Sequence, residues 1–170
     1  MRKKIVSRVP SATWDRVSGG ASYSTDIRVT PRGRLKMRLL VFETPAKLRS
    51  YWGKLRGGKF GGLCQGTRGA VNSLGREVLE YGKNGKLVGQ WIEVDGRYFA
   101  VMGLVRGYLG MEVVTHESVH AGIAYYDRSK GRLQWSRDDA LPEEDLAYPI
   151  GIIAKKVVIA LEKGGFYDKC

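Results

Sequence analysis

Two histidines and a glutamate lie close together in the segment THESVHAG, residues 115–122. His116 and His120 are four residues apart, and Glu117 directly follows the first of them. On an α-helix this spacing separates the histidines by about 40° and about 6 Å of rise, so both imidazoles can meet at one metal ion. Glu117 lies about 100° further round the helix, where it can take a proton from water instead of binding the ion. The segment therefore predicts a Zn²⁺ site with His116 and His120 as ligands and Glu117 as general base.

The alternative for this HExxH pattern is a pair of helix histidines satisfied by hydrogen bonds, with no metal. The chain contains no other histidine. Apolar residues in EVVTHESVHAGIAYY are spread over more than one face, which predicts a buried central helix. Such a helix is the rigid platform that a catalytic metal needs, and it favours the metal site.

A catalytic zinc site has a third protein ligand and an open fourth position. The two cysteines, Cys64 and Cys170, are distant in sequence and lie in no metal-binding motif. The remaining candidates are six downstream acids: Asp127, Asp138, Asp139, Glu143, Glu144 and Asp145. Three of them open a predicted helix, where acids also complement the helix dipole. The upstream HExxH favours one of these three, Glu143, Glu144 or Asp145, as the third ligand.

HESVHAG together with EEDLAYPIG, residues 143–151, resembles the small HExxH metallopeptidases often encoded by phages and mobile elements. These are minimal gluzincin-like zincins, related in pattern to SprT-like and ImmA-like proteases. The resemblance is specific from about residue 98 to residue 151. It implies Glu144 as the third zinc ligand, with Glu143 as the alternative. Pro149 departs from the pattern and should kink the helix that carries it.

The predicted activity is that of a zinc-dependent endopeptidase, a hydrolase of peptide bonds. Zinc brings the pKa of its water toward about 7, and Glu117 takes the proton and hands it to the leaving amine. The tetrahedral oxyanion needs a further donor. Tyr148, one turn after Glu144, is the first candidate, ahead of Tyr125 and Tyr126; the alternative for Tyr148 is a core aromatic. An extended substrate is expected to pair with the predicted strand 97–105.

The elements that must position these residues predict an α+β fold. We expect a strand at 34–44, a helix starting at Pro45 after the N-cap Thr44, and helices at 112–127 and 143–163. Turn signals at 83–85 and 95–96 predict hairpins, the second joining strands 91–94 and 97–105. Strands followed by helices favour a small, twisted, mainly antiparallel sheet with the helices on one face, in a zincin-like arrangement.

Positive charge is concentrated at the start of the chain. Residues 1–59 hold 15 of the 29 Lys and Arg residues but only three acids, which accounts for the entire net charge of +12. We therefore divide the chain into a basic arm, 1–33, and a metallopeptidase domain, 34–170. The basic residues 1–59 could bind nucleic acid. The alternative function is a non-enzymatic basic nucleic-acid-binding or virion-associated protein with a structural or degenerate metal site.

The sequence predicts a cytoplasmic protein. No apolar run approaches the length of a transmembrane helix, and the basic N-terminus is not followed by the apolar segment of a signal peptide. Two cysteines do not make a disulfide framework, which fits a reducing compartment. A cysteine-liganded deformylase-type site is disfavoured, because GGLCQG around Cys64 does not match its motif.

Overall fold

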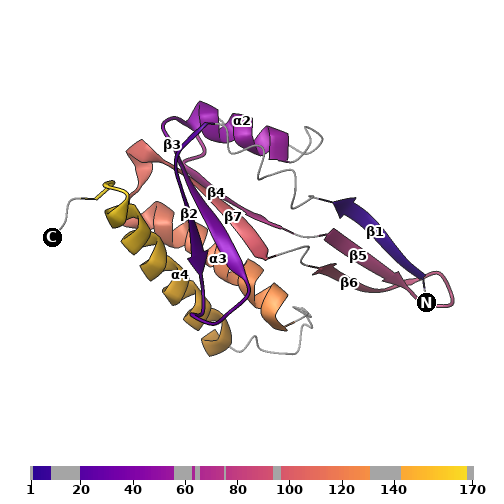
Figure 1. Ribbon diagram of the computed structural model, residues 1–170. Helices are drawn as coiled ribbons and strands as arrows, with labels where there is room; N and C mark the ends of the chain where they lie inside the picture. The colour runs from indigo at the N-terminus through magenta and orange to yellow at the C-terminus, as the bar shows by residue number, and fades with distance from the viewer. Residues whose placement is uncertain are drawn as a thin grey trace.

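The computed structural model describes residues 2–8, 20–55, 63, 66–74, 76–93, 97–130 and 143–167. Over these residues the fold is α+β, as predicted, with a four-stranded sheet, a three-stranded sheet and three α-helices (Figure 1). Within this described part, no helix is long and apolar enough to cross a membrane.

The four-stranded sheet has the order β2 (Ala21–Arg28), β3 (Lys36–Phe42), β7 (Tyr98–Val105), β4 (Gly69–Ser73). The outer pairs, β2–β3 and β7–β4, are antiparallel, and the central pair β3–β7 is parallel. The expectation that a substrate pairs with β7 is wrong, because β3 and β4 occupy both of its edges. In the described chain the free edges of this sheet belong to β2 and β4.

Helices cover both faces of this sheet, not one as expected. Helix α2 (Pro45–Leu55) lies on one face, and α3 (Met111–Lys130) and α4 (Glu143–Lys163) lie on the other (Figure 1). The reason is in the central strands, since β7 is buried at seven of its eight positions. A strand that is apolar on both faces needs cover on both faces.

Helix α2 forms as the sequence predicts. The Lys47 N–H donates to the Thr44 hydroxyl at 3.3 Å, which caps the N-terminus. Its buried face consists of Leu48, Tyr51, Trp52 and Leu55. It packs closely on β7, because a Cβ on Gly103 would come within 2.5 Å of the Leu48 side chain.

The three-stranded antiparallel sheet has the order β1 (Arg2–Arg8), β5 (Arg76–Tyr81), β6 (Leu87–Glu93). The predicted turn at 83–85 joins β5 to β6 and is confirmed, with Gly85 at φ 73°. The predicted hairpin between β6 and β7 is wrong: β6 pairs with β5 and β7 pairs with β3 and β4. Asp95 and Gly96 themselves lie outside the described residues.

The first 33 residues, expected as an arm ahead of the domain, contribute strands to both sheets. β1 pairs with β5, and β2 pairs with β3. The alternating burial of β2 places Ile27 in the core under α3 and α4, so this strand is part of the domain. Of the Pro and Gly residues that suggest an irregular segment, Gly20 directly precedes β2, and Pro31 and Gly33 lie at the turn 30–33, while Pro10 and Gly19 lie outside the described residues.

The last helix has the predicted bounds, residues 143–163. It ends at Gly164 and Gly165, where the Phe166 N–H donates to the Leu161 carbonyl at 2.9 Å and Gly165 adopts φ 74°. Pro149 lies inside the helix and is buried. Gly122 of α3 lets the two helices approach, because a Cβ there would come within 2.2 Å of Ile150.

Candidate metal centre

Helix α3 carries the HExxH segment and packs over β7 and β4, while α4 packs against α3 and β2. A short 3₁₀ helix, η1 (Arg106–Tyr108), joins β7 to α3. The sheet-facing side of α3 buries small and apolar residues such as Val114, Ala121 and Ala124. The buried Ser118 hydroxyl donates to the Val114 carbonyl at 2.7 Å, so it is satisfied within the helix. These contacts fix the rotation of α3 about its axis.

The imidazoles of His116 and His120 face each other on the exposed side of α3. Their Nε2 atoms are 3.2 Å apart, and their ring centroids are 4.9 Å apart at an interplanar angle of 71°. In the metal-free protein this separation suits an N–H···N hydrogen bond. Both side chains are exposed, so an ion can reach the two nitrogens from solvent.

The separation of the two nitrogens fits zinc. Zn–N bonds of about 2.0–2.1 Å at a tetrahedral angle place two ligand nitrogens about 3.3–3.4 Å apart. The observed 3.2 Å is close to that value. His116 and His120 can therefore act as a bidentate pair with little rearrangement.

Glu117 is buried beside this pair, with 6% of its surface exposed. Burial raises the pKa of its carboxyl, and the nearby His116 lowers it by less, so the net direction is upward. Among the described residues, no group donates a hydrogen bond to this carboxyl. A buried carboxyl with raised pKa and no structural partner is the arrangement expected of a general base.

The Glu117 side chain lies directly on the backbone of β4. A Cβ added to Gly69 would come within 2.8 Å of Glu117 Cγ and 3.0 Å of Oε1. The Glu117 carboxyl can therefore pack against β4 only because residue 69 is a glycine.

The outer edge of β4 offers free backbone groups beside Glu117. Arg68 accepts from the Val105 N–H at 3.1 Å, and the Leu74 N–H donates to the Phe99 carbonyl at 2.8 Å, so even-numbered residues of β4 bond to β7. Because the pattern alternates, the N–H and C=O groups of Gly69 and Val71 point away from β7, while the outward carbonyl of Ser73 accepts from the Asn72 side-chain amide at 3.3 Å. No strand of the described chain pairs with this edge.

The imidazoles face the same open edge. On a helix, His116 and His120 lie about 60–100° from Glu117 in one direction, and Gly122 lies about 140° from it in the other. Gly122 contacts α4, which lies toward β2, and Glu117 contacts β4. The imidazoles are therefore directed beyond the free edge of β4.

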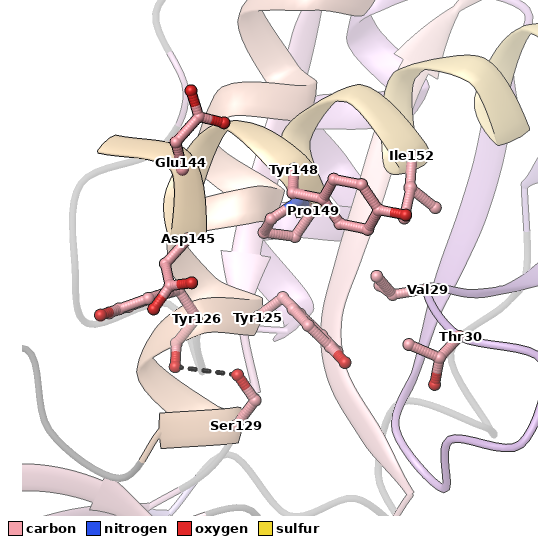
Figure 2. Close-up of a pocket in the computed structure, with 10 residues that line it drawn as sticks. All are labelled: Val29, Thr30, Tyr125, Tyr126, Ser129, Glu144, Asp145, Tyr148, Pro149 and Ile152. Atoms are coloured by element: carbon pink, nitrogen blue, oxygen red, sulfur yellow. Dashed lines mark hydrogen bonds between the residues drawn. The ribbon is translucent and has the colours of Figure 1, made fainter. Parts of the chain in front are cut away.

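Glu144 and Tyr148 are not brought to the imidazoles. They line a separate cavity of about 530 Å³ between α3, α4 and the end of β2 (Figure 2). Tyr125 lines the same cavity, and it lies nine residues, or about 180° of helix, from His116. Tyr148 is 73% exposed, so it is not a core aromatic.

In the described part of the chain, no third His, Cys, Asp or Glu joins the two histidines. The predicted ligand set with Glu144 is thus not assembled. Asp127 instead pairs with the buried guanidinium of Arg128. The side chain of Glu143, the residues Asp138 and Asp139, and both cysteines lie outside the described part.

Sequence reasoning missed Gly69 and the free edge of β4. The segment GTRGAVNS, residues 66–73, contains no motif and follows a Gly-rich stretch, so neither residue type nor spacing marks it. Only the pairing of β4 at the edge of the sheet gives Gly69 its place under Glu117.

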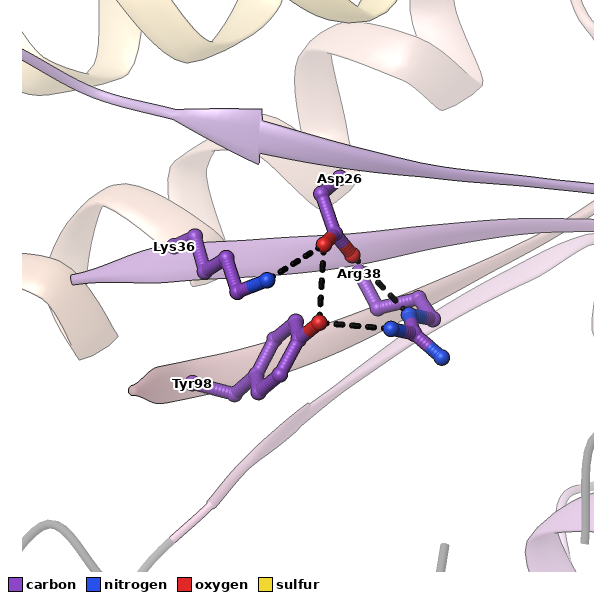
Figure 3. A network of polar contacts seen from close by, with 4 residues as sticks. All are labelled: Asp26, Lys36, Arg38 and Tyr98. Carbon is purple, nitrogen blue, oxygen red and sulfur yellow. Dashed lines mark hydrogen bonds and ion pairs between the residues drawn. The ribbon is translucent and has the colours of Figure 1, made fainter. Parts of the chain in front are cut away.

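A second polar cluster lies on β2, β3 and β7, and differs from the site in being fully paired (Figure 3). Asp26 accepts from Lys36 Nζ at 2.5 Å, Arg38 Nε at 2.9 Å and the Tyr98 hydroxyl at 2.7 Å. Burial raises the pKa of Asp26, but the hydrogen bonds from Lys36, Tyr98 and Arg38 outweigh it, so the pKa is lowered. This cluster holds three neighbouring strands together.

Comparison of the chain with protein-family models, curated proteins and solved structures gives no match. The functional assignment therefore rests on the geometry of the site. The binding of nucleic acid by the basic residues 1–59 stays a prediction.

Proposed function

We propose that this protein is a zinc-dependent endopeptidase in which His116 and His120 hold the ion and Glu117 is the general base. The observation that carries the proposal is the pair of Nε2 atoms 3.2 Å apart, placed beside a buried carboxyl that has no hydrogen-bond donor among the described residues. The proposal is also supported by the packing of α3, which carries the HExxH segment, over the antiparallel edge strand β4 of the sheet.

Each residue of the site has a distinct task. When bound, zinc supplies a Lewis acid that activates water and polarises a carbonyl. Glu117 accepts the proton from the attacking water and passes it to the leaving amine. Its raised pKa suits this work, because a base is most effective when its pKa approaches the working pH.

The substrate is expected to be an extended peptide. The outward N–H and C=O groups of Gly69 and Val71 can pair with an added strand, as in other sheet-edge complexes. Such a strand would pass beneath the imidazoles, which are directed beyond the same edge. Main-chain pairing would bind unfolded segments with little dependence on their side chains.

The proposal does not assign Glu144 or Tyr148 a role in the reaction. Both lie on the cavity side of α3, opposite the imidazoles. With two protein ligands defined, the remaining coordination positions fall to solvent, to substrate or to side chains outside the described part of the chain.

Two measurements test the proposal. Metal analysis by mass spectrometry should find one zinc per chain in the wild-type protein and none in His120→Ala. Cleavage of an unfolded protein should be observed for the wild type and lost in Glu117→Gln, with zinc retained. A Glu117→Gln variant that cleaves as fast as the wild type would exclude Glu117 as the base. A wild-type protein that binds no zinc would exclude the enzyme assignment.

A further inference from the structure

The contact between Glu117 and Gly69 has a consequence for the reaction. An ideal Cβ on Gly69 would lie 2.8 Å from Glu117 Cγ, 3.1 Å from Cδ and 3.0 Å from Oε1. Ordinary contacts begin at about 3.4 Å, so Glu117 Cγ would have to move by about 0.6 Å, and the carboxyl atoms Cδ and Oε1 by about 0.3–0.4 Å, to make room for a methyl group. Gly69 is therefore the residue of β4 that determines how closely the Glu117 carboxyl approaches the strand.

Nothing in the backbone of Gly69 requires glycine. Its φ is not positive, since the described glycines with positive φ are Gly20, Gly85 and Gly165. Within a strand glycine is usually disfavoured, because it packs no side chain and loses more conformational entropy on folding. The reason for a glycine here is thus the close approach of Glu117.

We propose that Gly69 is a positioning residue for Glu117: its missing side chain sets the depth at which the carboxyl lies beside the imidazoles. The N–H and C=O of Gly69 point to the free edge of β4. A peptide paired with this edge would therefore bond to the same residue that the Glu117 carboxyl packs against. Substrate alignment and base position are thereby tied together. This inference rests on the proposed peptidase function for its effect on catalysis, and on packing alone for its effect on Glu117.

The first test is a double-mutant cycle on the metal-free protein, by urea unfolding. Gly69→Ala should raise the unfolding equilibrium constant about tenfold in the wild-type background, a coupling typical of residues in contact. In a Glu117→Ala background, where no Cγ or carboxylate remains to clash, the same change should alter it by less than about twofold. Equal effects in the two backgrounds would overturn the inference.

The second test is steady-state kinetics of zinc-loaded Gly69→Ala on an unfolded protein substrate. A carboxyl displacement of about 0.3–0.4 Å predicts a kcat lower by about 3–10-fold, with KM and zinc stoichiometry within about twofold of the wild type. Gly66→Ala is the matched control, because nothing lies within 4 Å of a Cβ added there. An unchanged kcat, or loss that follows zinc loss, would overturn the positioning role. If the wild type cleaves nothing, the peptidase proposal fails, while the unfolding cycle still decides whether Gly69 holds Glu117 in place.

Discussion

Asp26 and Glu117 are carboxylates in two regions of one fold, and their surroundings are opposite. Asp26 lies on the sheet with three donors within 2.9 Å, and its pKa is lowered (Figure 3). Glu117 extends from α3 onto β4 with no donor among the described residues, and its pKa is raised. A carboxylate that stabilises a fold is paired, since an unpaired buried charge costs free energy. The proposed role as general base accounts for a buried carboxyl that lacks such partners among the described residues.

The largest effect should come from removing one of the two proposed zinc ligands. His120→Ala leaves one imidazole on α3. Loss of a residue that merely supports a metal ligand typically lowers metal affinity by about 10–100-fold, so loss of a ligand itself should lower the zinc affinity by more. Cleavage should be lost with it. Equilibrium dialysis with zinc gives the affinity, and Thr115→Ala, an exposed change on the same helix, is the control. Equal zinc affinity in the wild type and His120→Ala would contradict the pairing of the imidazoles as ligands.

Glu117→Gln should separate activity from stability. Loss of the base should lower kcat by about 10²–10⁴-fold while zinc stays bound. The metal-free variant should be more stable than the wild type at pH 7 by about 1 kcal/mol, because a buried unpaired charge is removed. Urea unfolding of both proteins measures this difference. A variant that is less stable than the wild type would mean that Glu117 holds the fold together, as Asp26 does.

Asp26→Asn should give the reverse pattern. Loss of the charged pairs with Lys36 and Arg38 should lower the free energy of unfolding at pH 7 by about 1–2 kcal/mol, with cleavage unchanged. Since the pKa of Asp26 is lowered, its stabilisation is fully present above the ordinary value of 3.8 and is lost as pH falls through the lowered value. Unfolding of both proteins from pH 7 to pH 2 should therefore show the difference shrinking at the acid end. A difference that grows toward low pH would contradict the assignment.

The smallest effects should come from the cavity between α3 and α4. Glu144→Gln and Tyr148→Phe should each change zinc affinity and kcat by less than about twofold, as surface substitutions do. Side-by-side dialysis and kinetics with His120→Ala make the comparison direct. A loss of zinc in Glu144→Gln as large as that in His120→Ala would place the third ligand on α4 after all.

Local signals in the sequence predicted the elements well. The cap at Thr44 and the glycines after residue 163 set the ends of α2 and α4 through contacts within a few residues. The spacing of His116 and His120 likewise predicted that their rings meet, because helix geometry alone decides it.

Relations between distant elements could not be predicted in the same way. The turn signal at residues 95–96 suggested that β6 and β7 pair, yet they belong to different sheets. Glu144 was expected beside the histidines, but the contact of Gly122 with Ile150 places α4 on another side of α3. The role of Gly69 depends on β4 lying at the sheet edge, which no residue pattern within residues 66–73 encodes.

X-ray absorption at the zinc edge of the zinc-loaded wild-type protein tests the central claim most directly. If His116 and His120 hold the ion, the spectrum should contain scattering from two imidazole rings with Zn–N distances of about 2.0–2.1 Å. Zinc bound without imidazole scattering, or no zinc bound at all, would contradict the account.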